Sequence, residues 1–185
     1  MTTQAQGKGG PRGSWWRMAG WGMAALVLLL PLVAMRFTDE VNWTVGDFIF
    51  AALLIGSVGL AYELTVRASR SWPFRAAIAV ALAASFLTIW VNGAVGMIGS
   101  EENGYNLLFL GVILLALCGA VVAGFRAGGM ALAMAAAAIA QAALGIVGAA
   151  SDLRGGILAT MFAGLWLLSA ALFRLAAQHG RPPEG

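Results

Sequence analysis

Six long apolar runs, separated by short polar segments, make up most of the chain. They cover residues 18–35, 47–66, 76–98, 107–125, 127–150 and 155–173. A helix needs about 20 mostly apolar residues to cross a bilayer, and helices satisfy their backbone hydrogen bonds internally in lipid. The pattern predicts an all-α integral membrane protein with six transmembrane helices.

The two ends of the chain differ from the middle in composition. The first segment, MTTQAQGKGGPRGS, is rich in glycine and polar residues, and the chain ends in QHGRPPEG. Neither end has enough apolar surface to fold alone. We expect a flexible cytoplasmic N-terminus over 1–14, one six-helix transmembrane domain over 15–175 and a flexible cytoplasmic tail over 176–185.

The first apolar run has a second interpretation. Lys8, Arg12 and Arg17 precede it, as basic residues precede the apolar part of a secretory signal. The run is longer than a typical signal and no A-x-A cleavage site follows it. A retained membrane anchor is therefore favoured, and a removed signal is the alternative.

The distribution of basic residues predicts the orientation. With the N-terminus inside, the cytoplasmic segments hold nine of the 11 Lys and Arg residues, and Arg36 and Arg154 fall outside. The outer turns are acidic, with Glu101, Glu102 and Asp152 among their residues. Basic residues accumulate on the cytoplasmic side of membrane proteins, so both termini are expected in the cytoplasm.

Composition limits the chemistry. The chain is 61% hydrophobic and 10% charged, with one cysteine, Cys118, and one histidine, His179. Four-cysteine metal sites, HExxH chemistry and two-histidine haem ligation are therefore excluded within one chain. The basic residues are spread between apolar runs and form no face for nucleic acid. We expect no enzyme activity, no metal and no cofactor.

Segments of the chain resemble one another weakly. PLVAMRFTDE (31–40) aligns with GAVGMIGSEE (93–102), and NGAVGMIGS (92–100) aligns with QAALGIVGA (141–149). These matches predict three tandem helical hairpins in parallel orientation. The alternative is chance alignment of a sequence rich in Ala, Gly, Leu and Val. The repeat would place Asn92 and Gln141 in equivalent positions.

Asn92 and Gln141 are the candidate polar site within the apolar runs. Asn92, Gly96 and Ser100 have helical spacing and are expected on one helix face. Small residues at this spacing let helices approach closely, and an amide can hydrogen-bond across the contact. The favoured interpretation is helix packing. The alternative is a pocket for a solute or a lipid headgroup between the third and fifth helices.

Glu63 and Arg67 are four residues apart, in the order that favours an ion pair on a helix. An ion pair at the membrane interface is the favoured interpretation, because long side chains reach toward water there. A proton relay is the alternative, and it would need a second ionisable group deeper in the bundle.

Two segments, NWTVGDFIFAALL and TIWVNGAVGMIGSEENGYN, carry a resemblance. They resemble uncharacterised small multi-pass inner-membrane proteins of Gram-negative bacteria, over roughly residues 37 to 150. The VNGAVG and GSEEN stretches are its most specific part. The resemblance implies a location and a helical membrane fold, and it brings no reaction, cofactor or ligand.

The function that these features favour is a non-enzymatic accessory or assembly component of the inner membrane. Its expected partners are the lipid bilayer and other membrane proteins that contact its glycine-rich helix faces. The alternative is a small-solute transporter or channel with Asn92 and Gln141 at its polar site.

Overall fold

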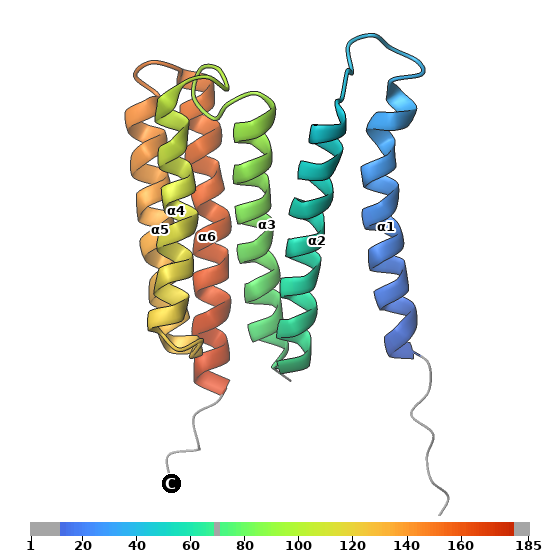
Figure 1. The fold of residues 1–185 in the computed structure, drawn as a ribbon. Helices are drawn as coiled ribbons and strands as arrows, with labels where there is room; N and C mark the ends of the chain where they lie inside the picture. Colours follow the sequence, from blue (N-terminus) through green and yellow to red (C-terminus); the bar gives the residue numbers. More distant parts are fainter. Residues whose placement is uncertain (1–11, 69–70, 180–185) are drawn as a thin grey trace, which may run out of the picture. The chain divides into compact units, whose positions relative to one another are not determined.

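The computed structural model describes residues 12–68 and 71–179, and within them every regular element is helical (Figure 1). The elements are α1 (Arg12–Ala34), α2 (Val45–Ala68), α3 (Trp72–Ala94), the short 3₁₀ helix η1 (Gly104–Asn106), α4 (Leu107–Val122), α5 (Ala127–Gly148) and α6 (Leu153–His179). The chain divides into two compact units, Met1–Gly59 and Leu60–Gly185.

The all-α class of the described residues agrees with the prediction. Five helices, α2 to α6, belong to segments long and apolar enough to cross a membrane, which is the pattern of a multi-pass membrane protein. The apolar part of α1, Met18–Ala34, is shorter. A sixth span and an arrangement in three parallel hairpins remain predictions.

The first unit shows why α2 begins where it does. Thr44 directly precedes the helix, and its Oγ1 accepts a hydrogen bond from the N–H of Asp47. Asp47 Oδ2 in turn accepts from the N–H of Thr44 at 2.7 Å and from its hydroxyl at 2.8 Å. This reciprocal pairing satisfies backbone donors that the first turn of a helix leaves free.

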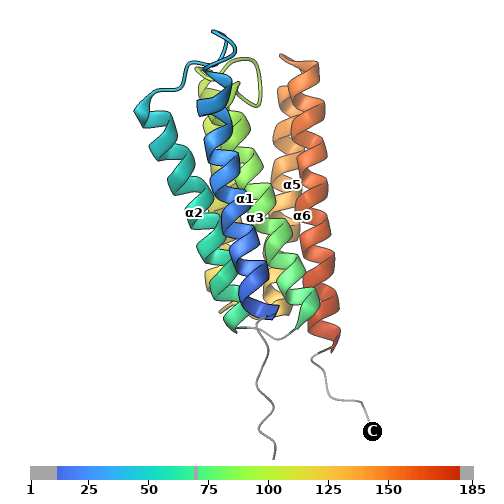
Figure 2. The ribbon, with the colours of Figure 1, turned by 90° about the vertical axis from the view of Figure 1, so that its right-hand side faces the viewer.

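In the second unit, α3 to α6 form an antiparallel bundle (Figure 2). α6 packs against both α5 and α3, α4 packs against α5, and α3 and α4 make only a few contacts with each other. The core is built mainly from alanines and a few large side chains, with Phe109, Trp166 and Phe173 almost fully buried. In lipid no hydrophobic effect drives helices together, so their association depends on close packing. Small residues such as these alanines let the helix backbones approach closely.

The seam between α5 and α6 is the tightest part of the bundle. A Cβ added to Gly145 would lie 2.7 Å from the backbone nitrogen of Thr160 and 2.9 Å from the carbonyl oxygen of Gly156. A Cβ added to Gly156 would lie 2.5 Å from the Cβ of Ala149. The two helix backbones are therefore in direct contact, and a larger residue at either glycine would push them apart.

Two helix ends differ from the prediction. The third apolar run was expected to stay helical to residue 98, but α3 ends at Ala94 and the chain turns at Gly96, whose φ is +77°. α6 extends to His179, beyond the predicted end of the domain at 175, and His179 Nδ1 lies 2.7 Å from the carbonyl oxygen of Leu175. The predicted flexibility of residues 1–11 and 180–185 concerns parts outside the described residues.

Candidate functional site

The loop between α3 and α4 is organised around one buried side chain, Asn106. Its Oδ1 accepts hydrogen bonds from the backbone N–H groups of Met97 and Ile98, at 3.2 and 2.8 Å. Its Nδ2 donates to the carbonyl oxygens of Ile98 and Ser100, at 3.3 and 2.8 Å. One amide thus satisfies four backbone groups in a segment that has no regular structure.

This loop is also bonded to the opposite helical hairpin. Asp152, which directly precedes α6, accepts from the N–H of Gly155 at 3.0 Å and from the N–H of Gly99 at 2.9 Å. Tyr105 donates its hydroxyl proton to the carbonyl oxygen of Leu144 in α5 at 2.8 Å. The α3–α4 loop and the α5–α6 turn lie at the same end of the bundle (Figure 1). We call this set of contacts the outer clamp, after the side of the membrane on which the charge pattern predicts these turns.

The two hydrogen bonds to Asp152 also affect its acidity. The N–H of Gly155 contributes most and the N–H of Gly99 next, and together they hold the pKa of the Asp152 carboxyl below its ordinary value. A carboxylate that accepts backbone hydrogen bonds is stabilised in its charged form. Asp152 is therefore ionised when the clamp is closed.

Gln141 lies in the interior of the bundle and is fully buried. Its Nε2 donates to the carbonyl oxygen of Ala159 in α6 at 3.2 Å, and its Oε1 has no hydrogen-bond partner among the described residues. A buried oxygen without a partner costs about 1–3 kcal/mol. This is the predicted amide tie between helices, with one half of the amide left unsatisfied.

Two further oxygen atoms on α3 share this property. Thr88 Oγ1 and Asn92 Oδ1 are buried and lack partners in the described part of the chain. The bond from Ser169 Oγ to the carbonyl oxygen of Ala77, at 2.9 Å, fixes the register of antiparallel α3 and α6. At about 1.5 Å per residue, Thr88 comes level with Leu158, one residue from Ala159, and Asn92 lies about 6 Å nearer the outer clamp.

The structure corrects the helix face predicted for Asn92, Gly96 and Ser100. Asn92 lies in the last turn of α3 and donates from Nδ2 to the carbonyl oxygen of Thr88 at 2.8 Å. Gly96 and Ser100 lie beyond the helix end, because the left-handed conformation at Gly96 stops it. Gly145, the residue expected to match Gly96, sits inside α5 instead. The two aligned segments therefore have different conformations.

The predicted pair of Glu63 and Arg67 forms at the end of α2. Arg67 Nη2 lies 3.2 Å from Glu63 Oε2. The Arg67 side chain is 63% exposed and that of Glu63 is 17% exposed, so the pair is the expected surface contact of an i, i+4 spacing. An exposed pair of this kind contributes about 0.3–0.5 kcal/mol.

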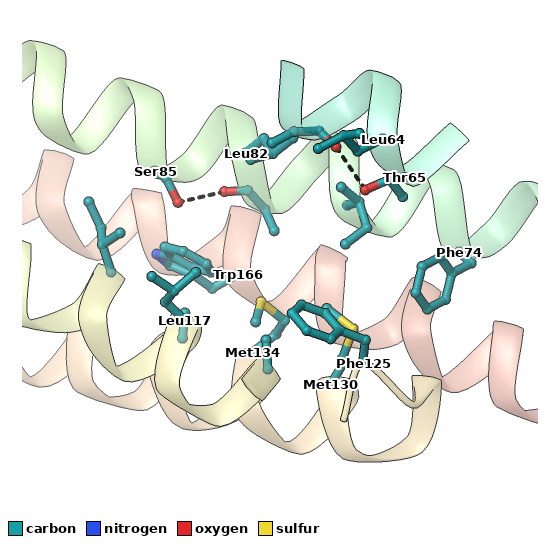
Figure 3. A pocket seen from close by; sticks show the side chains of 16 residues that line it. Leu64, Thr65, Phe74, Leu82, Ser85, Leu117, Phe125, Met130, Met134 and Trp166 are labelled. Carbon is teal, nitrogen blue, oxygen red and sulfur yellow. Dashed lines mark hydrogen bonds between the residues drawn. The ribbon is translucent and has the colours of Figure 1, made fainter. Parts of the chain in front are cut away.

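A cavity of about 680 Å³ lies within the second unit, between α3 and α4. Residues at the end of α2 and residues of α5 and α6 also line it, and the cavity is partly open to the surface. Figure 3 shows Trp166 of α6 between Ser85 of α3 and Leu117 of α4. The volume falls in the range of small-molecule sites, and no charged residue lines it in the part of the chain that the structure describes.

Sequence reasoning missed the residues of the outer clamp and this cavity. From the sequence, Asp152 was placed only among the outer acidic residues, although an Asp shortly before an apolar run is a signal for a helix N-cap. Asn106 carries the same signal before the run that begins at residue 107. The cavity has no signal in sequence, because it depends on α3 and α4 standing apart.

No family model, curated protein or solved structure matches the chain. Among residues 12–68 and 71–179, no group of three or more His, Cys, Asp or Glu side chains is placed to hold a metal ion.

Proposed function

We propose that the protein is a non-enzymatic accessory or assembly component of a bacterial inner membrane, with both termini in the cytoplasm. The outer clamp is the observation that carries this proposal. Asp152 and Tyr105 join the α3–α4 loop to the α5–α6 hairpin, and Gly145 holds the α5 and α6 backbones in contact.

These contacts favour a bundle whose helices stay fixed relative to one another over a bundle in which groups of helices move. Transporters of repeated architecture work by rocking one group of helices against another. In this bundle such a movement would break the bonds of Asp152 and Tyr105 together, and it would separate backbones that pack without intervening side chains. A fixed bundle suits a protein that holds others in place.

The placement of charge supports the orientation. Arg75, Arg126 and Arg174 belong to the end of the bundle where α3 begins, α4 ends and α6 approaches its end. Asp152 and Glu101 belong to the opposite end, with the outer clamp. Basic residues concentrate on the cytoplasmic side, and this supports the proposal that the clamp faces the outer side.

Two outward-facing glycines offer places for a partner helix. Gly111 of α4 and Gly164 of α6 are exposed, and a Cβ at either would meet no atom within 4 Å. Small residues on a membrane-facing surface let another helix approach closely.

The proposal is tested by purification from native membranes in mild detergent, followed by mass determination of the intact species. The expected result is one reproducible assembly that contains the chain together with a different protein. Gly111→Leu and Gly164→Leu should release a partner while the helix content stays the same. A lone chain under conditions that preserve other membrane complexes would contradict the proposal.

A small-solute transporter or channel is the second candidate, and Gln141 is the observation that favours it. Gln141 Oε1 and Thr88 Oγ1 are unpartnered oxygens at the same depth. Reconstituted protein would need to show solute flux that Gln141→Leu abolishes. Flux that is absent, or unchanged by the substitution, removes this candidate.

A further inference from the structure

We propose that the cavity between α3 and α4 holds one acyl chain of an anionic phospholipid, and that arginines at one end of the cavity bind its phosphate. This inference concerns a ligand and is independent of the accessory role. It begins from the lining, in which the hydroxyl groups of Thr65 and Ser85 already donate to the carbonyl oxygens of Ala61 and Ala81, each at 2.9 Å. No charged residue lines the cavity in the described part of the chain, so the part of a ligand that enters it must be apolar.

The cavity extends over about half of the membrane thickness. On α3 the lining runs from Phe74 to Ser85 (Figure 3), which is about 16 Å at helical rise, and the whole hydrocarbon core is about 30 Å thick. Trp166, which also lines the cavity, is the central residue of α6. At the other limit Trp72, two residues before Phe74, is exposed, as Trp residues at a membrane interface are. The cavity therefore has the length of an acyl chain from a single leaflet.

The interface end of the cavity is rich in arginine. Three lining residues there are each followed closely by an arginine, namely Phe74 by Arg75, Phe125 by Arg126 and Thr65 by Arg67. Glu63 is the one acidic residue described at this end of the second unit, and it pairs with Arg67. Three arginines against one glutamate leave an excess of positive charge. Basic pockets between helices at the membrane surface bind anionic headgroups, so the charge complements a phospholipid of this class.

Arg126 is the arginine best placed to bind a phosphate. Its side chain is exposed, and its guanidinium makes no hydrogen bond or ion pair with any of the described residues. Arg75 differs, because its Nη2 donates to the carbonyl oxygen of Val66 at 2.9 Å. A guanidinium can donate two parallel hydrogen bonds to phosphate oxygens. Arg126 thus keeps its donors for a headgroup whose chain enters the adjacent cavity.

Phe125 connects the apolar and the charged part of the site. Its φ is +57°, a left-handed conformation that residues other than glycine seldom adopt, and its N–H donates to the carbonyl oxygen of Ala120 at the end of α4. The ring lines the cavity beside Met130 (Figure 3), and Arg126 follows it directly. Strained residues concentrate at ligand sites, and here the strained turn joins the cavity wall to the arginine.

A helix of a partner protein fits the same cavity less well. A spanning helix crosses both leaflets, whereas the lining ends at Ser85 on α3 and at Ile113 on α4, near the middle of the membrane. An acyl chain with an anionic headgroup matches both the half-membrane length and the positive charge at one end.

The test measures lipid binding to the full chain in detergent by native mass spectrometry. The probes are dioleoylphosphatidylglycerol, which is anionic, and dioleoylphosphatidylcholine, which has the same acyl chains and no net charge. Wild type should bind one molecule of phosphatidylglycerol about fivefold more tightly than phosphatidylcholine, the effect of one basic residue near a phosphate. Arg126→Gln should remove this preference and leave phosphatidylcholine binding unchanged, which also shows that the variant keeps its cavity. Arg154→Gln, at an exposed arginine of the opposite end, should keep the preference.

Ala81→Phe and Ala83→Phe form the matched pair for the apolar part. Ala81 lines the cavity, and Ala83 is an exposed residue of the same helix, so the first should abolish binding of both lipids and the second should leave it intact. Equal affinity of wild type for the two lipids would overturn the proposal. So would a preference that survives Arg126→Gln, or phosphatidylglycerol binding that Ala81→Phe leaves unchanged. A polypeptide bound to wild type without lipid, and lost in Ala81→Phe, would assign the cavity to a partner helix instead.

Discussion

The backbone N–H of Gly99 donates to Oδ2 of Asp152 over 2.9 Å, joining residues 53 positions apart in the chain. The other oxygen of the same carboxylate accepts from the N–H of Gly155 and caps α6. One side chain thus caps the N-terminus of α6 and hydrogen-bonds a distant loop to it. Removing the charge should affect both functions together.

Asp152 makes the stability of the outer clamp depend on pH. Because the pKa of Asp152 is lowered in the folded protein, its stabilisation is fully present above the ordinary value of about 3.9 and is lost as pH falls through the lower folded value. We predict that Asp152→Asn lowers the melting temperature in detergent at pH 7. The difference from wild type should stay constant above about pH 4 and should shrink below it, as the pH falls through the lowered pKa of Asp152.

Glu101→Gln is the control for Asp152, because Glu101 is an exposed carboxylate on the same loop. This variant should melt like wild type across the pH range. A difference between wild type and Asp152→Asn that does not shrink as the pH falls below about 4 would mean that charge is not what holds the clamp.

Asn106→Ala should destabilise the protein more than any surface substitution in the loop. The change leaves the buried N–H groups of Met97 and Ile98 without their acceptor, and each costs about 1–3 kcal/mol. Hydrogen exchange by mass spectrometry should show faster exchange at these two amides. Protection equal to wild type would show that Asn106 does not organise the loop.

Gly96 and Gly104 form a matched pair for the loop conformation. Gly96 has φ +77°, and a Cβ there would meet the carbonyl group of Ser100 and lie 2.8 Å from Asn106 Nδ2. Gly104 has open space around the same position. Gly96→Ala should lower the free energy of unfolding by at least about 1–2 kcal/mol, and Gly104→Ala should change it by less than about 0.5 kcal/mol. Equal effects of the two substitutions on the free energy of unfolding would contradict the left-handed conformation at Gly96.

Substitutions at Gln141 and at Ser169 should change the stability of the protein in opposite directions. Gln141→Leu removes an unpartnered buried oxygen that costs about 1–3 kcal/mol, together with the bond to Ala159, which contributes about 0.6 kcal/mol. The net effect should be a gain in stability of about 1 kcal/mol. Ser169→Ala removes the bond to Ala77 that joins α6 to α3, and should lower stability by about 0.6 kcal/mol, with an upper limit near 2. Thermal unfolding in one detergent measures both. A loss of stability in Gln141→Leu would instead indicate that the amide is fully hydrogen-bonded, for example to buried water.

The sequence predicts the helices well because their cause is local. Apolar runs of spanning length must satisfy their own backbone groups in lipid, and five of the six runs became helices of spanning length and apolar character. The ion pair of Glu63 and Arg67 formed for the same reason, since an i, i+4 spacing is set by the helix itself.

The end of α3 was predicted wrongly because the residues after Ala94 are apolar. Met97 and Ile98 are each 1% exposed, but they are buried in a loop rather than a helix. What allows this is Asn106, eight and nine positions away, which replaces the missing helical hydrogen bonds. The periodicity of apolar residues cannot reveal this replacement of backbone hydrogen bonds, because it depends on a side chain that folds back across a turn.

The same limit applies to the candidate site. Gln141 could be singled out as a lone polar residue in an apolar run, but its unpartnered oxygen depends on how α5 meets α6. Asp152 and Gly99 are linked only through the folding of two separate hairpins. Tertiary contacts of this kind leave no trace in local spacing.

The intact mass of the protein extracted gently from its own membranes tests the accessory role most directly. The account predicts one assembly of reproducible composition, larger than a single chain, that Gly111→Leu or Gly164→Leu disrupts without loss of helix content. A single chain or a homo-oligomer, recovered where other membrane complexes survive, would contradict it.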